Sequence, residues 1–175
     1  MVRSDVFDKL VSMRKILSLL LISFATLALC QEVTTFVLVR HAEKADDGTK
    51  DPPLTAEGTE RAERISDLLK KQTITALYST PYKRTRETLA FVAKEKSLEI
   101  KEYDPFSKDE WLEGLLQEHT GGTILISGHS NTIPILANAL LGKDVFSQFD
   151  DTDYSNLIIV TTEEIGKGKL VRLTF

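Results

Sequence analysis

The chain has 175 residues, of which 42% are hydrophobic and 27% are charged. These proportions are typical of a globular protein and exclude a fibrous or largely disordered chain. Lys and Arg number 22 against 26 Asp and Glu, so the chain lacks the net positive charge of a general nucleic-acid binder. A single Cys cannot form an intrachain disulfide, and a chain of this length folds around one core without such cross-links.

An uncharged apolar segment, residues 16–30, follows the basic pair Arg14 and Lys15. This is the pattern of an export signal, and it is shorter than the roughly 18 residues of a membrane-spanning helix. A membrane anchor and a buried core helix are the less favoured interpretations. We therefore expect residues 1–30 to be a signal, with Met13 as a candidate start, and residues 31–175 to form one exported domain, periplasmic or secreted.

The segment ends in Ala28, Leu29 and Cys30, which leaves two processing routes open. Cleavage after Cys30 uses the small residues Ala28 and Cys30. Lipidation of Cys30 is the alternative, and Leu29 is bulkier than the usual residue before a lipidated Cys. We favour cleavage, and we expect membrane attachment only if Cys30 is lipidated.

Strand and helix patterns alternate after the signal. Short β-branched and apolar runs predict strands, and recurrence of apolar residues on one face predicts helices. Thr55 is a candidate helix cap, and Ala62, Ile65, Leu68 and Leu69 form the expected buried face. The expected strands are 35–40, 74–79, 98–103, 123–127, 156–161 and 169–175; the expected helices start near 55, 81, 109 and 131.

Alternation of strands and helices followed by a closing hairpin predicts an α/β fold. We expect a three-layer sandwich with a mostly parallel central sheet, an antiparallel edge and helices on both faces. Arg40 and His41 follow the first strand, Arg84 opens the helix after the second, and His129 follows the strand 123–127. Because the carboxyl ends of parallel strands form the ligand crevice, these side chains should meet in one pocket suited to phosphate.

Four segments in order are similar to motifs of the histidine phosphatase superfamily, which includes phosphoglycerate mutases and short phosphohistidine phosphatases. They are 38–44 (LVRHAEK), 53–58 (PLTAEG), 78–88 (YSTPYKRTRET) and 126–131 (ISGHSN). Each motif alone is weak, whereas four in order at expected strand ends are specific. The resemblance runs from about residue 35 to 141.

The resemblance implies a phosphatase in which His41 attacks phosphorus and forms a phosphohistidine. A backbone carbonyl should hold the opposite ring nitrogen of His41. Arg40 and Arg84 would clamp the phosphoryl oxygens, and His129, expected to be protonated, would donate to another. No metal or other cofactor is needed for this neutralisation.

The general acid is the least defined residue. Ser130 excludes the branch of the family in which Asp follows the second histidine. Between Arg84 and His129 the candidates are Asp104, our first choice, and then Glu102; Glu110 and Glu113 also lie in this segment. The segment is short, which favours the phosphohistidine phosphatases over sugar-phosphate mutases.

Several other residues have open roles. Glu43 and Lys44 contact either substrate or only solvent, and Ser79 and Asn131 either bind phosphate or cap helices. His119 and Arg86 are interpreted as structural. The expected substrate is a phosphorylated small molecule or a phosphoprotein. A non-catalytic phospholigand binder remains the main alternative, while three His without close pairing fit a zinc enzyme poorly.

Overall fold

The computed structural model describes residues 32–105 and 108–175, so the expected export signal lies outside the described residues. Val33–Phe175 form one compact unit, and the sheet lies in it. Across the two described ranges, no helix combines the length and apolar character required to cross a membrane.

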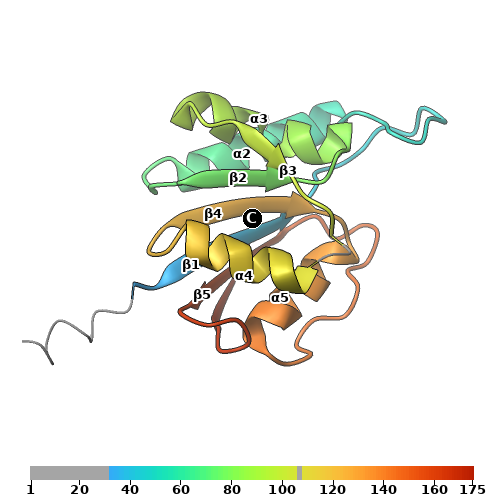
Figure 1. Ribbon diagram of the computed structural model, residues 1–175. Coiled ribbons are helices and arrows are strands. Elements are labelled where there is room, and N and C mark those ends of the chain that lie inside the picture. The colour runs from blue at the N-terminus through green and yellow to red at the C-terminus, as the bar shows by residue number, and fades with distance from the viewer. Residues whose placement is uncertain (1–31, 106–107) are drawn as a thin grey trace, which may run out of the picture. The chain divides into compact units, whose positions relative to one another are not determined.

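The domain is built on a six-stranded sheet with the strand order β3-β2-β4-β1-β5-β6 (Figure 1). Strands β1 to β4 pair in parallel, β5 runs antiparallel to β1, and β6 runs antiparallel to β5. The expected α/β fold with a mostly parallel sheet and an antiparallel edge is confirmed. The strands are β1 (Thr34–Arg40), β2 (Ala76–Ser79), β3 (Ile100–Glu102), β4 (Thr123–Gly128), β5 (Asn156–Thr162) and β6 (Lys169–Thr174).

Helices cover both faces of this sheet because the strands are apolar on both sides. In β1, Phe36 and Leu38 belong to the core under two helices, whereas Val37 and Val39 belong to the core under the other two. This alternation follows from the two-residue period of a strand. The first pair is α4 (Lys108–Glu118) with α5 (Thr132–Leu141), and the second is α2 (Ala56–Leu69) with α3 (Lys83–Lys96) (Figure 1).

Helix α2 begins where the sequence predicts. The Thr55 hydroxyl oxygen accepts a hydrogen bond from the Gly58 N–H at 3.0 Å. The prediction that Leu68 lies on the buried face is wrong, because Leu68 is 52% exposed. Ser66 takes the buried position between α2 and α3, where its hydroxyl donates to the carboxylate of Glu95 at 3.0 Å.

The remaining elements differ from the predictions mainly at their ends. Strand β2 starts at Ala76 and β3 has only three residues, both shorter than predicted. Asn131 occupies the N-cap of α5 but makes no side-chain capping hydrogen bond. The predicted hairpin is present as β5 and β6.

Candidate active site

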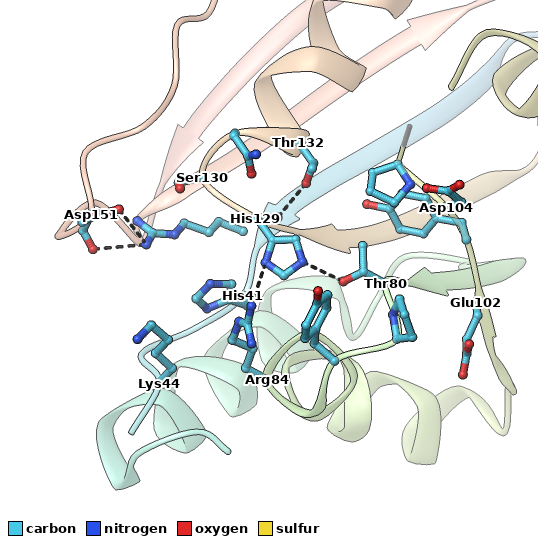
Figure 2. A pocket seen from close by; sticks show the side chains of 16 residues that line it. His41, Lys44, Thr80, Arg84, Glu102, Asp104, His129, Ser130, Thr132 and Asp151 are labelled. Atoms are coloured by element: carbon cyan, nitrogen blue, oxygen red, sulfur yellow. Dashed lines mark hydrogen bonds and ion pairs between the residues drawn. The ribbon is translucent and has the colours of Figure 1, made fainter. Parts of the chain in front are cut away.

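A cavity of about 710 Å³ opens at the carboxyl ends of β1, β2 and β4. It lies at the place predicted from the parallel sheet, and Figure 2 shows His41, Arg84 and His129 side by side within it. The residues that line it are Arg40, His41, Lys44, Thr80, Pro81, Tyr82, Arg84, Glu102, Tyr103, Asp104, Pro105, His129, Ser130, Asn131, Thr132 and Asp151.

His41 is buried directly after β1, and its ring is held in one orientation. Its Nδ1 lies 2.8 Å from the carbonyl oxygen of Ala42. A carbonyl only accepts, so Nδ1 carries the proton and Nε2 keeps its lone pair. Burial, together with the nearby Arg40 guanidinium, lowers the His41 pKa to about 3. His41 is therefore neutral at physiological pH, as a nucleophile must be.

The backbone behind His41 is fixed by the motif that follows Arg84. The N–H of Ala42 donates to the Thr88 hydroxyl at 2.9 Å, and that hydroxyl donates to the Arg84 carbonyl at 2.7 Å. Glu87 accepts from the Leu54 N–H at 2.7 Å and so attaches the loop before α2 to α3. These contacts give the consecutive residues Glu87 and Thr88 a physical role.

Two glycines allow close backbone approaches around the pocket. A Cβ at Gly58 would collide with the Glu43 carbonyl, so only glycine lets α2 pack against the chain after His41. A Cβ at Gly128 would lie 2.8 Å from both the Thr132 hydroxyl and the Tyr103 hydroxyl. Any larger residue at either position would displace a pocket wall.

His129 faces His41, with ring centroids 5.5 Å apart. Its Nε2 lies 2.9 Å from the Thr80 hydroxyl and its Nδ1 lies 3.5 Å from Arg84 Nη2. Burial, followed by the charges of Arg84 and Arg40, lowers the His129 pKa to about 4. In the unliganded pocket, two guanidinium groups and a desolvated site oppose a positive charge on His129, so the predicted protonation of His129 stays a prediction for the phosphoryl-bound site.

Arg40 is held by the loop between α5 and β5. Its Nη1 donates to the backbone carbonyls of Asp150 and Asp153 at 2.7 and 3.0 Å, and Nη2 donates to that of Asp151 at 3.2 Å. The Tyr154 ring lies 4.1 Å from the guanidinium carbon. We call residues 150–154 the Arg40 loop.

Arg84 is held instead by side chains. Its Nη1 lies 3.8 Å from the Asp51 carboxylate, and its guanidinium carbon lies 4.4 Å from the centre of the Tyr82 ring. Within the described part of the chain, Nε of Arg84 and Nε of Arg40 are buried without a hydrogen-bond partner. Buried donors of this kind indicate a place for an acceptor-rich ligand.

Both candidate acids line the pocket, on the opposite side of His129 from Lys44 and Asp151 (Figure 2). Glu102 forms an ion pair with Arg86, which accounts for the structural role predicted for Arg86. Asp104 is the second residue after the end of the short strand β3, with Tyr103 between them. The structure thus places the first-choice acid at the pocket wall.

The other candidates separate into two groups. Asn131 and Lys44 line the pocket, whereas Glu43 and Ser79 are not among its lining residues. Glu43 accepts hydrogen bonds from Arg61, which also donates to the Phe175 carbonyl oxygen at 3.1 Å. Ser79 is buried and donates to the Thr80 carbonyl at 2.8 Å.

His119 lies outside the pocket, with Nε2 3.1 Å from the Tyr78 hydroxyl. Within residues 32–105 and 108–175, no group of three or more His, Cys, Asp or Glu is arranged to hold a metal ion. The pocket instead combines two arginines, two neutral imidazoles and neighbouring hydroxyl groups. Such donors suit a tetrahedral oxyanion.

Comparison with known proteins agrees with this geometry. Residues 36–107 match the sequence profile of the histidine phosphatase superfamily (branch 1), and this segment contains Arg40, His41 and Arg84 in the positions described. This part of the chain is thus similar to the histidine phosphatase superfamily. No curated protein matches it by sequence.

Solved histidine phosphatase structures share the fold at low sequence identity. The protein histidine phosphatase SixA, complexed with tungstate, superposes with a TM-score of 0.67 at 21% identity, covering 80% of this chain and 96% of that one. A mycobacterial glucosyl-3-phosphoglycerate phosphatase superposes with a TM-score of 0.65 at 12% identity, covering 82% of this chain and 98% of that one. YhfR of Bacillus stearothermophilus superposes with a TM-score of 0.62 at 18% identity, covering 81% of this chain and 96% of that one.

Sequence reasoning missed three contributors to this pocket. Thr80 contacts His129, Tyr82 contacts both Arg84 and His129, and the Arg40 loop supplies carbonyl groups to Arg40. Thr80 and Tyr82 lie inside the motif around Arg84, so their position between strand and helix was an available signal. The carbonyl groups of the Arg40 loop had no sequence signal, since every residue carries a backbone carbonyl.

Proposed function

We propose that the protein is a metal-independent phosphatase that hydrolyses a phosphomonoester or a phosphoprotein through a phosphohistidine on His41. The observation that carries the proposal is the His41 ring: its Nδ1–H is held by the Ala42 carbonyl, so the lone pair of Nε2 is available beside the buried Arg40 and the partly buried Arg84. A neutral, oriented imidazole next to fixed positive charge is suited to attack on phosphorus.

In the first step His41 Nε2 forms a bond to phosphorus, and the bond from phosphorus to the leaving oxygen breaks. Arg40 and Arg84 stabilise the negative charge on the phosphoryl oxygens. The carboxyl group of Asp104 gives its proton to the leaving oxygen. A protonated leaving group departs more easily, which is the contribution of general acid catalysis.

In the second step water attacks phosphorus and the bond to His41 Nε2 breaks. The Asp104 carboxylate accepts the proton from that water, which restores its starting form. Inorganic phosphate leaves, and throughout the cycle one proton stays on His41 Nδ1, which donates it in a hydrogen bond to the Ala42 carbonyl oxygen. The cycle therefore needs no redox change and no additional reactant besides water.

The direct test is hydrolysis of an aryl phosphate by the purified protein in EDTA. We expect phosphate release together with an acid-labile, base-stable phosphate on the protein, and loss of both in His41→Gln. His119→Gln makes the same chemical change outside the pocket and should retain both. A folded wild-type protein that shows neither release nor labelled intermediate contradicts the proposal and favours the phospholigand binder.

The role of Asp104 is tested with two leaving groups. Asp104→Asn should change kcat/KM for an aryl phosphate little, because this ratio reports the transfer to His41 and that leaving group needs no proton. It should lower hydrolysis of an alkyl phosphate by about 10²-fold or more, as expected for a general acid. Equal effects on both substrates would exclude Asp104 from this role.

We further propose that the protein is exported, as the pattern of residues 1–30 indicates. N-terminal sequencing of the protein from fractionated cells tests this. A mature N-terminus at Gln31 supports cleavage, a lipid-modified Cys30 supports the alternative route, and an intact N-terminus in the cytoplasmic fraction contradicts export.

A further inference from the structure

A chain of hydrogen bonds links His129 to α3 through two threonines. The Thr85 hydroxyl lies 3.0 Å from the Thr80 carbonyl and 2.9 Å from the Tyr82 carbonyl, and both can only accept. Its single proton is therefore committed to these oxygens. The Thr80 hydroxyl, 3.0 Å from Thr85 Oγ1, must then donate to Thr85.

With its proton used on Thr85, Thr80 can only accept from His129. The Thr80 oxygen lies 2.9 Å from His129 Nε2, so Nε2 carries a proton. A neutral imidazole has only one proton, which leaves Nδ1 without one.

The opposite side of the ring gives the same answer independently. His129 Nδ1 lies 3.5 Å from Nη2 of Arg84, and a guanidinium group can only donate. A proton on Nδ1 would point at that donor. Both neighbours of the His129 ring therefore favour the tautomer with a proton on Nε2.

His41 has the opposite tautomer, because its Nδ1–H is held by the Ala42 carbonyl. The two imidazoles of the pocket therefore keep lone pairs on different nitrogens, Nε2 in His41 and Nδ1 in His129. The first is needed for attack on phosphorus. The second, beside Arg84, would repel a phosphoryl oxygen, since both are acceptors.

We propose that Thr80 is a positioning residue that fixes His129 as the Nε2–H tautomer, so that binding of a phosphoryl group is coupled to uptake of one proton at His129 Nδ1. This inference rests on the proposed function and deepens it. The proton comes from solvent and forms an N–H bond at Nδ1. The resulting imidazolium donates from Nδ1 to the phosphoryl oxygen and from Nε2 to Thr80.

The charges around His129 are consistent with this coupling. Arg84 faces the ring from α3, and Arg40 and His41 face it from the end of β1. Thr132 of α5 and the ring of Tyr82 are uncharged neighbours. In the unliganded pocket, burial and then the positive charges of Arg84 and Arg40 lower the pKa of His129, and a bound dianion opposes this effect.

Tautomers are measured directly by two-dimensional ¹H–¹⁵N spectra of the ¹⁵N-labelled protein that correlate ring nitrogens with ring protons. The chain has three His, and His→Gln variants at each position assign them. At neutral pH we expect the proton on Nδ1 for His41 and on Nε2 for His129. A proton on Nδ1 of unliganded His129, alone or with one on Nε2, overturns the proposal.

Proton uptake is measured by calorimetric titration with tungstate, which stays a dianion at neutral pH, in buffers of different ionisation enthalpy. We expect uptake approaching one proton per tungstate bound at about pH 7. Binding without proton uptake overturns this inference alone. Absence of tungstate binding overturns this inference, and the aryl phosphate test then decides the proposed function separately.

The role of Thr80 is separated from simple packing by two variants. Thr80→Val keeps the shape but leaves the imidazolium Nε2–H without an acceptor, so tungstate affinity should fall about 10–100-fold and proton uptake should decrease. Thr80→Ser should restore both. Weaker binding with unchanged tautomer and unchanged uptake in Thr80→Val would indicate a packing role and overturn the assignment.

None of these measurements depends on turnover. A protein that hydrolyses phosphate esters but shows the other His129 tautomer keeps the proposed function and loses this inference. If the protein binds tungstate with proton uptake but does not hydrolyse phosphate esters, this inference holds and the proposed catalytic function fails.

Discussion

The two arginines of the pocket are held in different ways. Arg40 is fixed by three backbone carbonyls of the Arg40 loop, and its side chain is 4% exposed. Arg84 is fixed by the side chains of Asp51 and Tyr82, and its side chain is 14% exposed. Both line the same cavity beside the two histidines.

This difference separates stability from affinity. Three backbone carbonyls of the Arg40 loop accept hydrogen bonds from the Arg40 guanidinium and lose this donor when Arg40 is replaced. Arg40 therefore links the pocket to the folding of that loop. The partners of Arg84 are a carboxylate 39% exposed to solvent and an aromatic ring, and neither requires Arg84 in order to stay hydrated or packed. Substitutions at the two positions should therefore have different signatures.

Arg40→Ala should give the largest combined effect. It removes the proposed phosphoryl donor and the side-chain donor of three carbonyls in the Arg40 loop, of which that of Asp150 keeps the Asp153 N–H as a donor. We expect kcat/KM to fall by about 10²–10³-fold and the free energy of unfolding by about 2–4 kcal/mol. Aryl phosphate kinetics and urea denaturation measure the two quantities. An unchanged stability would show that the loop does not depend on Arg40.

Arg84→Lys should affect activity far more than stability. Lys keeps the positive charge but lacks the planar fork that binds two oxygens, so we expect about a 10²-fold loss in kcat/KM. The free energy of unfolding should change by less than about 1 kcal/mol. The same pair of measurements applies, and a stability loss equal to that of Arg40→Ala would remove the contrast.

Acid should destabilise the protein through the two pocket histidines. Their pKa values are lowered from 6.5 to about 3 in His41 and about 4 in His129, so between these values and pH 6.5 the unfolded chain binds more protons than the native protein. The contribution of the two histidines to the free energy of unfolding is therefore complete above pH 6.5. It is lost as pH falls toward 4, by about 1.4 kcal/mol per pH unit for each histidine.

Urea denaturation between pH 7 and pH 4.5 measures this loss, and His129→Gln provides the matched comparison. The variant should show a shallower decline because one of the two neutral histidines is absent. A decline identical to that of the wild type would mean that His129 is not neutral in the native pocket.

The smallest effect is expected for Asp51→Asn. The Asp51 carboxylate lies 3.8 Å from Arg84 Nη1 and competes with a bound oxyanion for that guanidinium. Asn can still accept from the Lys83 N–H, which Asp51 binds at 2.9 Å. Tungstate affinity should rise by about 2–5-fold, the range of a partly exposed ion pair. A weaker affinity would show instead that Asp51 orients Arg84.

The order of strands and helices could be predicted because each depends on a local pattern. The pocket could be located because the carboxyl ends of parallel strands meet at one edge of the sheet. That rule brought Arg40, His41, Arg84 and His129 together from three distant segments. The exposed Leu68 was mispredicted because its apolar character says nothing about which side of α2 faces the neighbouring helix.

Two properties of the site depend on the folded arrangement and have no local signal. The neutral state of His129 follows from burial between two arginines, neither of which is its neighbour in sequence. Arg40 is held by hydrogen bonds to backbone carbonyls more than a hundred residues away in the sequence, and every residue has such a carbonyl. Chemistry carried by side chains was therefore easier to predict than chemistry carried by the backbone.

The contact between Arg61 and Phe175 has a practical consequence for handling the protein. Arg61 binds both the Glu43 carboxylate, two residues after His41, and the carbonyl oxygen of Phe175. An affinity tag or fluorescent partner fused after Phe175 would therefore lie beside the ion pair that holds the segment after His41. The exposed turn at Lys167 is no better site for a fusion, because the N–H groups of Gly166 and Gly168 both donate to the carbonyl oxygen of Leu140 in α5.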